Sequence, residues 1–304
     1  MKSKQLFFSV AAMAVTASVL FVACSKSTSA DAVAPTATQQ SVSLYMTDGP
    51  GVFNNVFLDI KSVEVLVDTS KNTRDHDRCN WDTLGNKPAL PKDSTFFVWS
   101  NLNVTAGLYD LLQLRNGVDT LLSTANIAKG AIRLIRINLG TASYIIKDSV
   151  KYTLNIPPTA PSYIIVKLGG GEWEAFGSNR YRLWLDFDVA RSIIFYNNAY
   201  YLAPFLRPFL PSQTGAVYGS VAPKDAFPEL IKVFSSTDTS MALPNKDGVF
   251  LVRGLKDGTY SVLIHSLRQD SLGIAILPYK DTTISNVVVK NANSVFVGNI
   301  SLHK

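Results

Sequence analysis

Hydrophobic and polar positions alternate in short segments along most of the chain after residue 40. In residues 41–47, for example, one side carries Val42, Leu44 and Met46, and the other carries Ser43, Tyr45 and Thr47. A period of two residues is typical of a β-strand with one buried face. The segments are rich in Val, Ile, Tyr and Phe and are bounded by Gly, Pro, Asn or Asp, as strands usually are.

The pattern predicts strands in two groups, separated near residue 211. The segments are residues 41–47, 55–67, 95–100, 131–139, 144–146, 150–156, 162–168, 181–189, 192–196 and 200–209, then 216–221, 230–234, 248–252, 258–265, 283–289 and 294–302. Helical turns are plausible around 109–114 or 120–127, but neither segment keeps a 3.6-residue period. Many short strands without helices between them predict an all-β chain of two antiparallel β-sandwich domains.

Prolines and turn residues set the boundaries of these domains. Pro204, Pro208 and Pro211 interrupt regular pairing, so we expect one sandwich over residues 41–211 and a smaller one over 212–304. In the second domain, Lys-Asp-Gly occurs at 246–248 and again at 256–258. Because Asp-Gly supplies a residue with positive φ, each triplet predicts a tight turn between two strands.

The first 23 residues have the pattern of a secretory signal. Lys2 and Lys4 precede an uncharged apolar run from residue 6 to residue 23, and Cys24 follows at once. The ending resembles a bacterial lipobox, in which the cysteine is lipidated and becomes the new N-terminus, although Phe21 stands where an aliphatic residue is usual. The alternative is an uncleaved membrane anchor, because the run is close to the roughly 20 residues that span a bilayer.

Residues 24–40 continue the lipoprotein pattern as a small, polar segment, which predicts a flexible tether after Cys24. Ser25 stands where Asp commonly retains lipoproteins in the inner membrane, so resemblance to that sorting rule points to the outer membrane. The lipid on Cys24 would bind the membrane. Either the periplasmic or the cell-surface face is compatible with the sequence.

Composition narrows the classes of partner. The 304 residues carry a formal charge of +6, and 47% of them are hydrophobic, as in a folded protein. No basic run or basic helix appears after the signal, so we expect no nucleic-acid partner. The chain has two cysteines, Cys24 and Cys79, which excludes a disulfide scaffold.

Five motifs in order give the first domain a family resemblance. They are LYMTDGP at 44–50, VFLDIKSVEV at 56–65, YDLLQLRNG at 109–117, IRLIR at 132–136 and LDFDVARS at 185–192. With these motifs, residues 41 to about 210 resemble a family of bacterial lipoprotein domains of unknown function (the domain of unknown function 4382 type). Gly49 stands where that family often has Ala. The resemblance implies a fold and no particular chemistry.

The second domain is similar to the carboxypeptidase regulatory-like modules. The motifs are GAVYGSV at 215–221, IKV at 231–233, NKDGVF at 245–250 and GLKDGTYSV at 254–262, whereas PKDAFP at 223–228 departs from the family's Gly-rich loop. The resemblance implies a seven-stranded sandwich related to transthyretin. Such modules are generally non-catalytic, and carbohydrate binding is one role attributed to the wider fold group.

Candidate chemistry is sparse. His76, His265 and His303 lie far apart, and no motif of a zinc site, a catalytic triad or a phosphate loop occurs. Residues 68–82 gather acids with His76 and Cys79, but their spacing misses the calcium-loop pattern and basic residues balance the charges. We therefore expect residues 68–82 to form a solvated hairpin loop, and metal binding by this segment is the alternative. For the protein as a whole we expect neither a metal nor a cofactor.

Asp186 and Asp188 lie two residues apart on a predicted strand, so their side chains share a face about 6.6–7 Å apart. Glycosidases use two carboxylates at about 5–10 Å, so the pair fits a hydrolase by distance. Arg182 or Arg191 could instead pair with these acids. We expect the structural ion-pair role.

Aromatic and amide side chains are the candidate ligand contacts, because exposed rings stack on sugars. The candidates are Trp173, Trp184, Asn198, Tyr200 and Tyr201. The alternative for each is packing in the core or at a sheet end. The sequence thus predicts a non-enzymatic, membrane-anchored envelope lipoprotein that binds a partner such as a glycan. The alternatives are a structural module that binds another envelope protein and, less favoured, a glycoside hydrolase.

Overall fold

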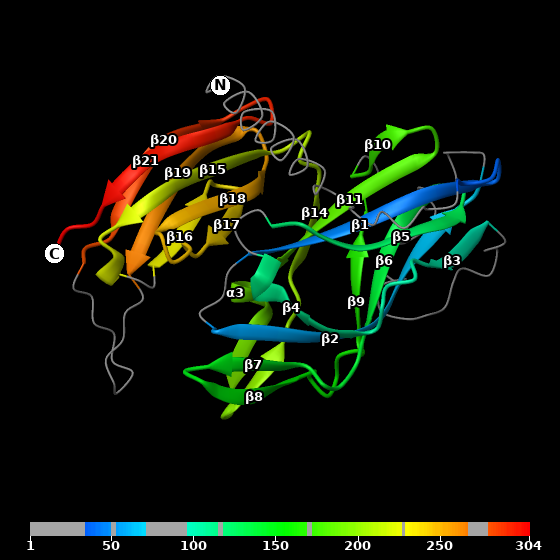
Figure 1. Cartoon of the computed structure of the whole chain (residues 1–304), viewed down its shortest axis with the longest axis horizontal. Helices are drawn as coiled ribbons and strands as arrows, with labels where there is room; N and C mark the ends of the chain where they lie inside the picture. Colours follow the sequence, from blue (N-terminus) through cyan, green and yellow to red (C-terminus); the bar gives the residue numbers. More distant parts are fainter. Residues whose placement is uncertain are drawn as a thin grey trace, which may run out of the picture. The chain divides into compact units, whose positions relative to one another are not determined.

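The computed structural model describes residues 34–49, 53–70, 96–114, 118–168, 172–226, 229–266 and 279–304. These residues belong to one compact unit, residues 34–304. Almost all of its regular structure is β, in four sheets (Figure 1). The all-β prediction is confirmed. The predicted signal, Cys24 and most of the 68–82 loop lie outside the described residues.

The first sheet has five strands in the order β10-β11-β1-β5, with β14 also paired to β11. Its strands are β1 Gln39–Gly49, β5 Thr120–Ala128, β10 Glu174–Gly177, β11 Arg180–Asp188 and β14 Leu206–Phe209. The pairing of β1 with β11 is parallel and runs from Ser41 opposite Arg180 to Gly49 opposite Asp188. The two strands are far apart in sequence, so this pairing joins the beginning of the first domain to a segment near its end.

The second sheet has nine strands around the long strand β2. Along one edge, β2 pairs first with β7 and then with β6. Along its other edge, β2 pairs first with β4 and then with β3. Ile60 shows that the two edges differ, because it pairs with β6 and with β4 at once. The strands are β2 Asn55–Asp68, β3 Phe97–Asn101, β4 Gly107–Asp110, β6 Ala131–Leu139, β7 Tyr144–Lys147, β8 Val150–Asn155, β9 Tyr163–Lys167, β12 Ile193–Tyr196 and β13 Ala199–Leu202.

These two sheets share one hydrophobic core, as a sandwich requires. Leu44 and Leu185 of the first sheet and Val65 and Ile137 of the second are fully buried in a common cluster. Each such side chain stabilises the fold by about 1.5–3 kcal/mol relative to exposure. The alternation predicted for β1 is confirmed, because Val42, Leu44 and Met46 all face this core.

The C-terminal strands form two further sheets around a core of their own, in which Val217 and Phe250 meet Ile231 and Ile264. The orders are β18-β15-β21 and β17-β16-β19-β20. The strands are β15 Gly215–Ala222, β16 Glu229–Phe234, β17 Thr239–Ala242, β18 Val249–Leu255, β19 Gly258–Ser266, β20 Thr282–Val289 and β21 Ser294–Ser301. Pairing is mainly antiparallel; β1–β11, β8–β13 and β15–β21 are the parallel pairs among the described strands.

Several predicted elements differ from the structure. Residues 120–127 are not helical but lie in β5, because the segment pairs with β1 and buries Leu122, Ala125 and Ile127 in the first core. Around 109–114 the helical prediction is partly correct, since the 3-10 helix η2 covers Leu111–Leu114. Short helices α3 Val189–Ser192 and η3 Lys224–Ala226 were not predicted. The strand predicted over 200–209 splits into β13 and β14 around Pro204.

The two Lys-Asp-Gly turns differ in their glycines. Gly248 has φ +83°, and a Cβ there would lie 2.3 Å from the carbonyl oxygen of Val221, so glycine is required. The prediction of positive φ is confirmed at Gly248. It is wrong at Gly258, whose φ is not positive; Gly254, with φ +72°, lies before that turn, inside β18.

Candidate functional site

A tight hairpin joins β12 to β13 and presents aromatic side chains on both of its faces. Its two turn residues, Asn197 and Asn198, have φ of 47° and 57°. Two positive values define the type I′ turn, which suits the twist of paired strands and which Asn tolerates. The register sets Phe195 opposite Tyr200 and Ile194 opposite Tyr201. Residues opposite one another share a face, so Tyr200 and Tyr201 point to opposite sides.

Tyr200 points toward the core. Only 9% of it is exposed, and its ring centroid lies 5.9 Å from Phe53, 5.3 Å from Tyr152 and 4.8 Å from Phe195. Leu202, two residues on, is buried in the first core. Tyr200 therefore packs the inner side of the hairpin, and we leave it out of the candidate site.

The opposite face of the hairpin is open to solvent. Tyr196 is 71% exposed and Ile194 is 50% exposed, while Tyr201 is half-buried beside them. Asn198 is exposed at the turn itself. Exposed apolar groups in a cluster are typical of interaction sites.

The same outer face continues across neighbouring strands of the sheet. Tyr201 is opposite Asn155 of β8, and Tyr144 of β7 is opposite Thr153. The Tyr144 ring stacks on Phe57 with centroids 4.5 Å apart, and Lys151 Nζ lies 3.8 Å from its centroid. We call this surface the aromatic face. It comprises Phe57, Tyr144, Ile194, Tyr196 and Tyr201.

The two candidate tryptophans lie elsewhere. Trp184 is 7% exposed, stacks on Tyr45 at 5.0 Å, and donates from Nε1 to Asp119 at 3.0 Å. The Trp184 ring therefore packs against Tyr45 and is not available to a ligand. Trp173 is half-buried against the first core, and its Nε1 has no hydrogen-bond partner among the described residues.

Sequence reasoning thus identified Tyr201 of this surface, and Asn198 at the turn of the same hairpin, but missed Tyr196, Ile194, Phe57 and Tyr144. The alternation of β12 places Ile194 and Tyr196 on one side. That was the available signal, but it did not say which side faces solvent. Pairing with β8 and β7 decides the side, and it is not visible in the sequence.

The two carboxylates of β11 are both held by arginines. Asp186 pairs with Arg207 at 3.0 Å, and Asp188 pairs with Arg191 at 2.6 Å. Asp188 also accepts from the Arg191 backbone N–H and caps α3. The predicted pairing of Asp188 with Arg191 is confirmed. Arg182, the other predicted partner, pairs instead with Glu174 at 2.6 Å.

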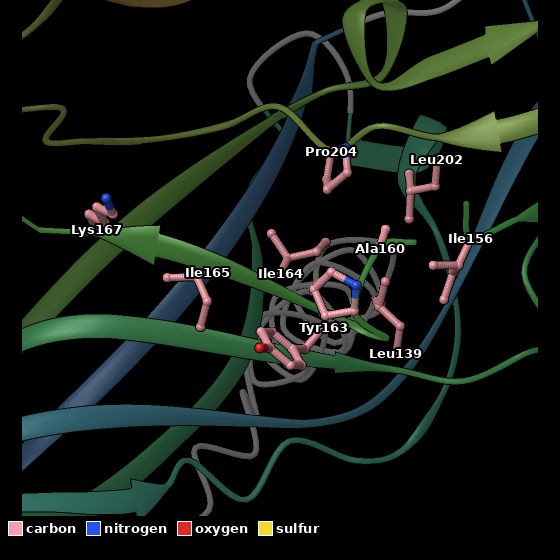
Figure 2. Close-up of a pocket in the computed structure, with 10 residues that line it drawn as sticks. Leu139, Ile156, Ala160, Tyr163, Ile164, Ile165, Lys167, Leu202 and Pro204 are labelled. Atoms are coloured by element: carbon pink, nitrogen blue, oxygen red, sulfur yellow. The ribbon is translucent and has the colours of Figure 1, made fainter. Parts of the chain in front are cut away.

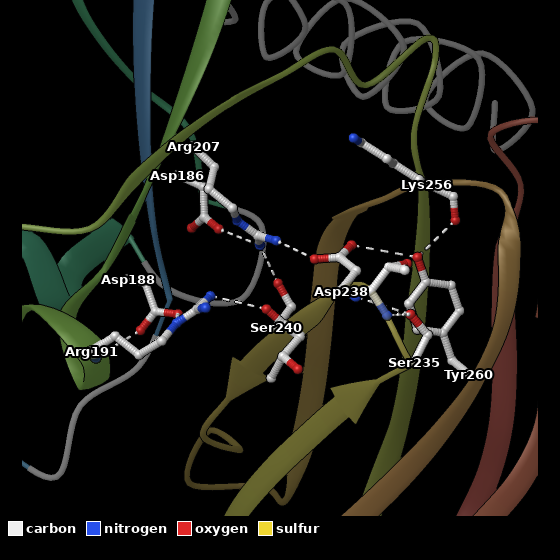
Figure 3. A network of polar contacts seen from close by, with 11 residues as sticks. Asp186, Asp188, Arg191, Arg207, Ser235, Asp238, Ser240, Lys256 and Tyr260 are labelled. Carbon is white, nitrogen blue, oxygen red and sulfur yellow. Dashed lines mark hydrogen bonds and ion pairs between the residues drawn. The ribbon is translucent and has the colours of Figure 1, made fainter. Parts of the chain in front are cut away.

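The same arginines reach the C-terminal sheets (Figure 3). Arg207 Nη1 donates to Asp238 at 3.0 Å, and Nη2 also contacts the Ser240 hydroxyl. Arg191 Nη2 donates to the Thr239 carbonyl oxygen at 2.9 Å. Charged hydrogen bonds therefore cross between the two pairs of sheets.

Burial changes the acidity of two groups in this network. Desolvation raises the pKa of Asp186, and the charge of Arg207 opposes that rise. Desolvation, followed by the charge of Asp238, raises the pKa of Tyr260 to about 12. The Tyr260 hydroxyl donates to the Lys256 carbonyl oxygen at 2.9 Å (Figure 3). Tyr260 is therefore neutral at physiological pH.

A cavity of about 620 Å³ adjoins the network, and we call it the junction cavity. It is lined by Glu172, Asp186, Arg207, Pro208, Phe209, Thr214, Ser235, Ser236, Thr237, Asp238, Gly254, Lys256, Asp257, Gly258, Thr259 and Tyr260. A second cavity, of about 310 Å³, is mainly apolar. Figure 2 shows Leu139, Ile156, Ile164 and Leu202 around it, with Tyr163 and Lys167 as its polar groups.

Within the described part of the chain, no group of three or more His, Cys, Asp or Glu residues could hold a metal ion. The described residues also contain no helix long and apolar enough to cross a bilayer. His76 and Cys79 of the predicted loop lie outside those residues.

Several solved structures are similar to parts of the chain. A type II Cohesin-X-Dockerin complex from Acetivibrio cellulolyticus matches with 20% identity over 29% of this chain, which spans 56% of that chain, at a TM-score of 0.22. The shaft pilin SpaA from Lactobacillus rhamnosus GG matches with 9% identity over 87% of this chain and 97% of that one, at a TM-score of 0.23. A streptococcal ancillary pilin matches with 11% identity over 86% and 69% of the two chains, at a TM-score of 0.22.

No curated protein sequence matches the chain. One family model does match it, over residues 39–204, and its description is "Domain of unknown function (DUF4382)". The match begins with β1, extends past β13 and covers more than half of the chain. The resemblance drawn from the five motifs of the first domain is thereby confirmed. The chain belongs to the DUF4382 family.

Proposed function

We propose that this protein is a non-enzymatic envelope lipoprotein that binds carbohydrate through its aromatic face. The observation that carries the proposal is the exposure of Tyr196 beside Ile194 and Tyr201 on a hairpin whose two strands are paired. Removing aromatic rings from water is favourable, so a partner that covers these exposed rings gains binding free energy. Their exposure therefore favours a binding role. Because strands rather than loops hold the rings, little ordering is needed when a ligand binds.

Carbohydrate is the favoured partner because the surface combines rings with polar groups. The open faces of Tyr196 and Tyr201 suit the apolar side of a sugar ring. Asn198 at the turn supplies amide donors and acceptors, and Lys151 and Thr153 on β8 are exposed nearby on the same face. Hydroxyl groups of a sugar need both donors and acceptors.

The proposal also covers anchoring and the C-terminal module. The apolar run that ends at Cys24 supports lipid attachment at the outer membrane. The motifs at 215–262 support a carboxypeptidase regulatory-like module, which would act without catalysis. Asp186 and Asp188 support no hydrolase, because an arginine engages each carboxylate.

A structural role is the second candidate function. Ile194 is apolar and 50% exposed, and an aliphatic side chain fits a protein surface better than a sugar ring. On this alternative the aromatic face would bind another envelope protein. Crosslinking in cells that captures a stoichiometric partner at this face would favour it.

A glycan array tests the carbohydrate proposal. The purified full chain, in a detergent without a sugar head group, is screened beside the Tyr201→Ala and Asn198→Ala variants. Reproducible binding of a glycan class that both variants weaken is the expected result. If the protein bound no glycan on a broad array, the carbohydrate proposal would be overturned and the protein-binding alternative would remain.

A further inference from the structure

We propose that the junction cavity is a second binding site, and that it takes a small neutral saccharide. This inference concerns residues other than the aromatic face and does not depend on it. The cavity volume of about 620 Å³ lies within the range of about 300–1,000 Å³ that is typical of small-molecule sites. Both the N-terminal and the C-terminal sheets contribute to its lining.

Donors and acceptors in the cavity are available to a ligand. The Arg207 side chain lines the cavity and is 20% exposed. Ser236, Thr237 and Thr259 are exposed along the cavity, and within the part of the chain that the structure describes their hydroxyls are not engaged in a hydrogen bond.

The charges of the lining select against an anion. Carboxylates outnumber cations, because Glu172, Asp186, Asp238 and Asp257 face Arg207 and Lys256. Arg207 is already shared between Asp186 and Asp238, both at 3.0 Å (Figure 3). An anionic ligand would therefore meet net repulsion, whereas the carboxylates can accept hydrogen bonds from neutral hydroxyl groups.

Phe209 adds only a small apolar area to the cavity. It lines the cavity but is 5% exposed, because it packs with Trp184 and Leu210. Gly254 lies close against the ring, since a Cβ at that position would lie 3.3 Å from Phe209 Cγ. Hydroxyls and carboxylates in one cavity match a polyhydroxylated, uncharged molecule.

The test is ligand-observed saturation-transfer NMR followed by calorimetry on the full chain, in a detergent without a sugar head group. The probes are glucose, galactose, mannose, N-acetylglucosamine, maltose and cellobiose, with glucuronate as the charged counterpart of glucose. We expect at least one neutral probe to bind with a dissociation constant below about 10 mM, and glucuronate to bind at least about tenfold more weakly than glucose.

Substitutions locate the binding. Ser236→Trp, at an exposed position, should fill the cavity and weaken binding at least about tenfold, and Thr259→Val should weaken it about threefold to tenfold through one lost hydrogen bond. The control Thr283→Trp, exposed on β20 and outside the cavity, should leave the affinity within about twofold of the wild type. No binding by any neutral probe, or binding that Ser236→Trp leaves unchanged, would overturn the proposal.

These variants allow the aromatic-face proposal and the junction-cavity proposal to be rejected independently of each other. Loss of binding in Tyr196→Ala with full binding in Ser236→Trp would support the aromatic face and reject the cavity. The reverse pattern would support the cavity and reject the aromatic face for that probe.

Discussion

Arg207 Nη1 lies 3.0 Å from Asp238 Oδ1 and joins strand β14 to the residue just before β17. The same guanidinium holds Asp186 at 3.0 Å. Its side chain is 20% exposed, so water screens these contacts only in part. One arginine therefore compensates two carboxylates that belong to the N-terminal and C-terminal sheets.

Removing Arg207 should destabilise the protein strongly. Arg207→Ala leaves Asp186 and Asp238 without their shared cation, and breaking a buried pair in this way costs about 3–5 kcal/mol. Arg182→Ala is the matched control, because Arg182 is 38% exposed and pairs with Glu174 within one sheet. That change should cost about 0–1 kcal/mol. Urea unfolding followed by circular dichroism measures both, and equal costs would contradict the assigned role of Arg207.

Stability should fall as the pH rises through the range set by Glu229. This residue is 2% exposed, and burial raises the pKa of its carboxyl group from 4.5 to about 7. Below pH 4.5 both the folded and the unfolded chains hold the proton. Between pH 4.5 and 7 only the folded chain keeps it, so ionisation progressively favours unfolding, and above pH 7 the loss is complete.

Glu229→Gln removes this ionisation and provides the measurement. The variant should gain melting temperature relative to the wild type as the pH is raised from 4.5 to 8. Glu174→Gln serves as the control, since Glu174 is not fully buried and forms an ion pair. A constant difference between Glu229→Gln and the wild type across that range would contradict the raised pKa.

The Gly248 turn should not accept a side chain. Gly248→Ala forces a Cβ to within 2.3 Å of the Val221 carbonyl oxygen at a φ of +83°. Both effects destabilise the folded state, and we expect a loss of more than about 1 kcal/mol in the free energy of unfolding. Gly107→Ala, where a Cβ meets nothing within 4 Å, should be nearly neutral by the same denaturation assay. Similar losses in the two variants would show that the turn is not strained as described.

Lipid attachment has an internal control in the second cysteine. Cells that express Cys24→Ala and are fed radiolabelled palmitate should yield unlabelled precursor, because the variant lacks the thiol to which we propose that the lipid is attached. Cys79→Ala should be labelled like the wild type. Normal labelling of Cys24→Ala would remove the anchoring proposal while leaving the binding proposals in place.

The sequence predicts single strands well because alternation is a local property. The period-two pattern of Val42, Leu44 and Met46 is enough to identify β1 and the side that faces the first core, although Ser43 and Thr47 on the other side are buried as well. It does not reveal that β1 pairs in parallel with β11, about 140 residues away. The helical prediction for residues 120–127 is wrong for a related reason, since pairing with β1 overrides the weak local preference of this segment for a helix.

The candidate site was harder to predict because the face of each residue depends on register. Tyr200 and Tyr201 are adjacent and chemically alike, yet one packs against Phe53 and the other lies on the aromatic face. Arg207 gave no sequence signal either. Its partners Asp186 and Asp238 lie 21 and 31 residues away, and the fold alone brings the three together.

The most direct test of carbohydrate binding compares two exposed tyrosines. Tyr196 is 71% exposed on the aromatic face, and Tyr218 is 39% exposed on β15, in the C-terminal sheets. For the best glycan from the array, titration calorimetry should show that Tyr196→Ala weakens binding about tenfold, or about 1.4 kcal/mol, whereas Tyr218→Ala leaves it unchanged. Equal affinities for the wild type and Tyr196→Ala would contradict the proposed function.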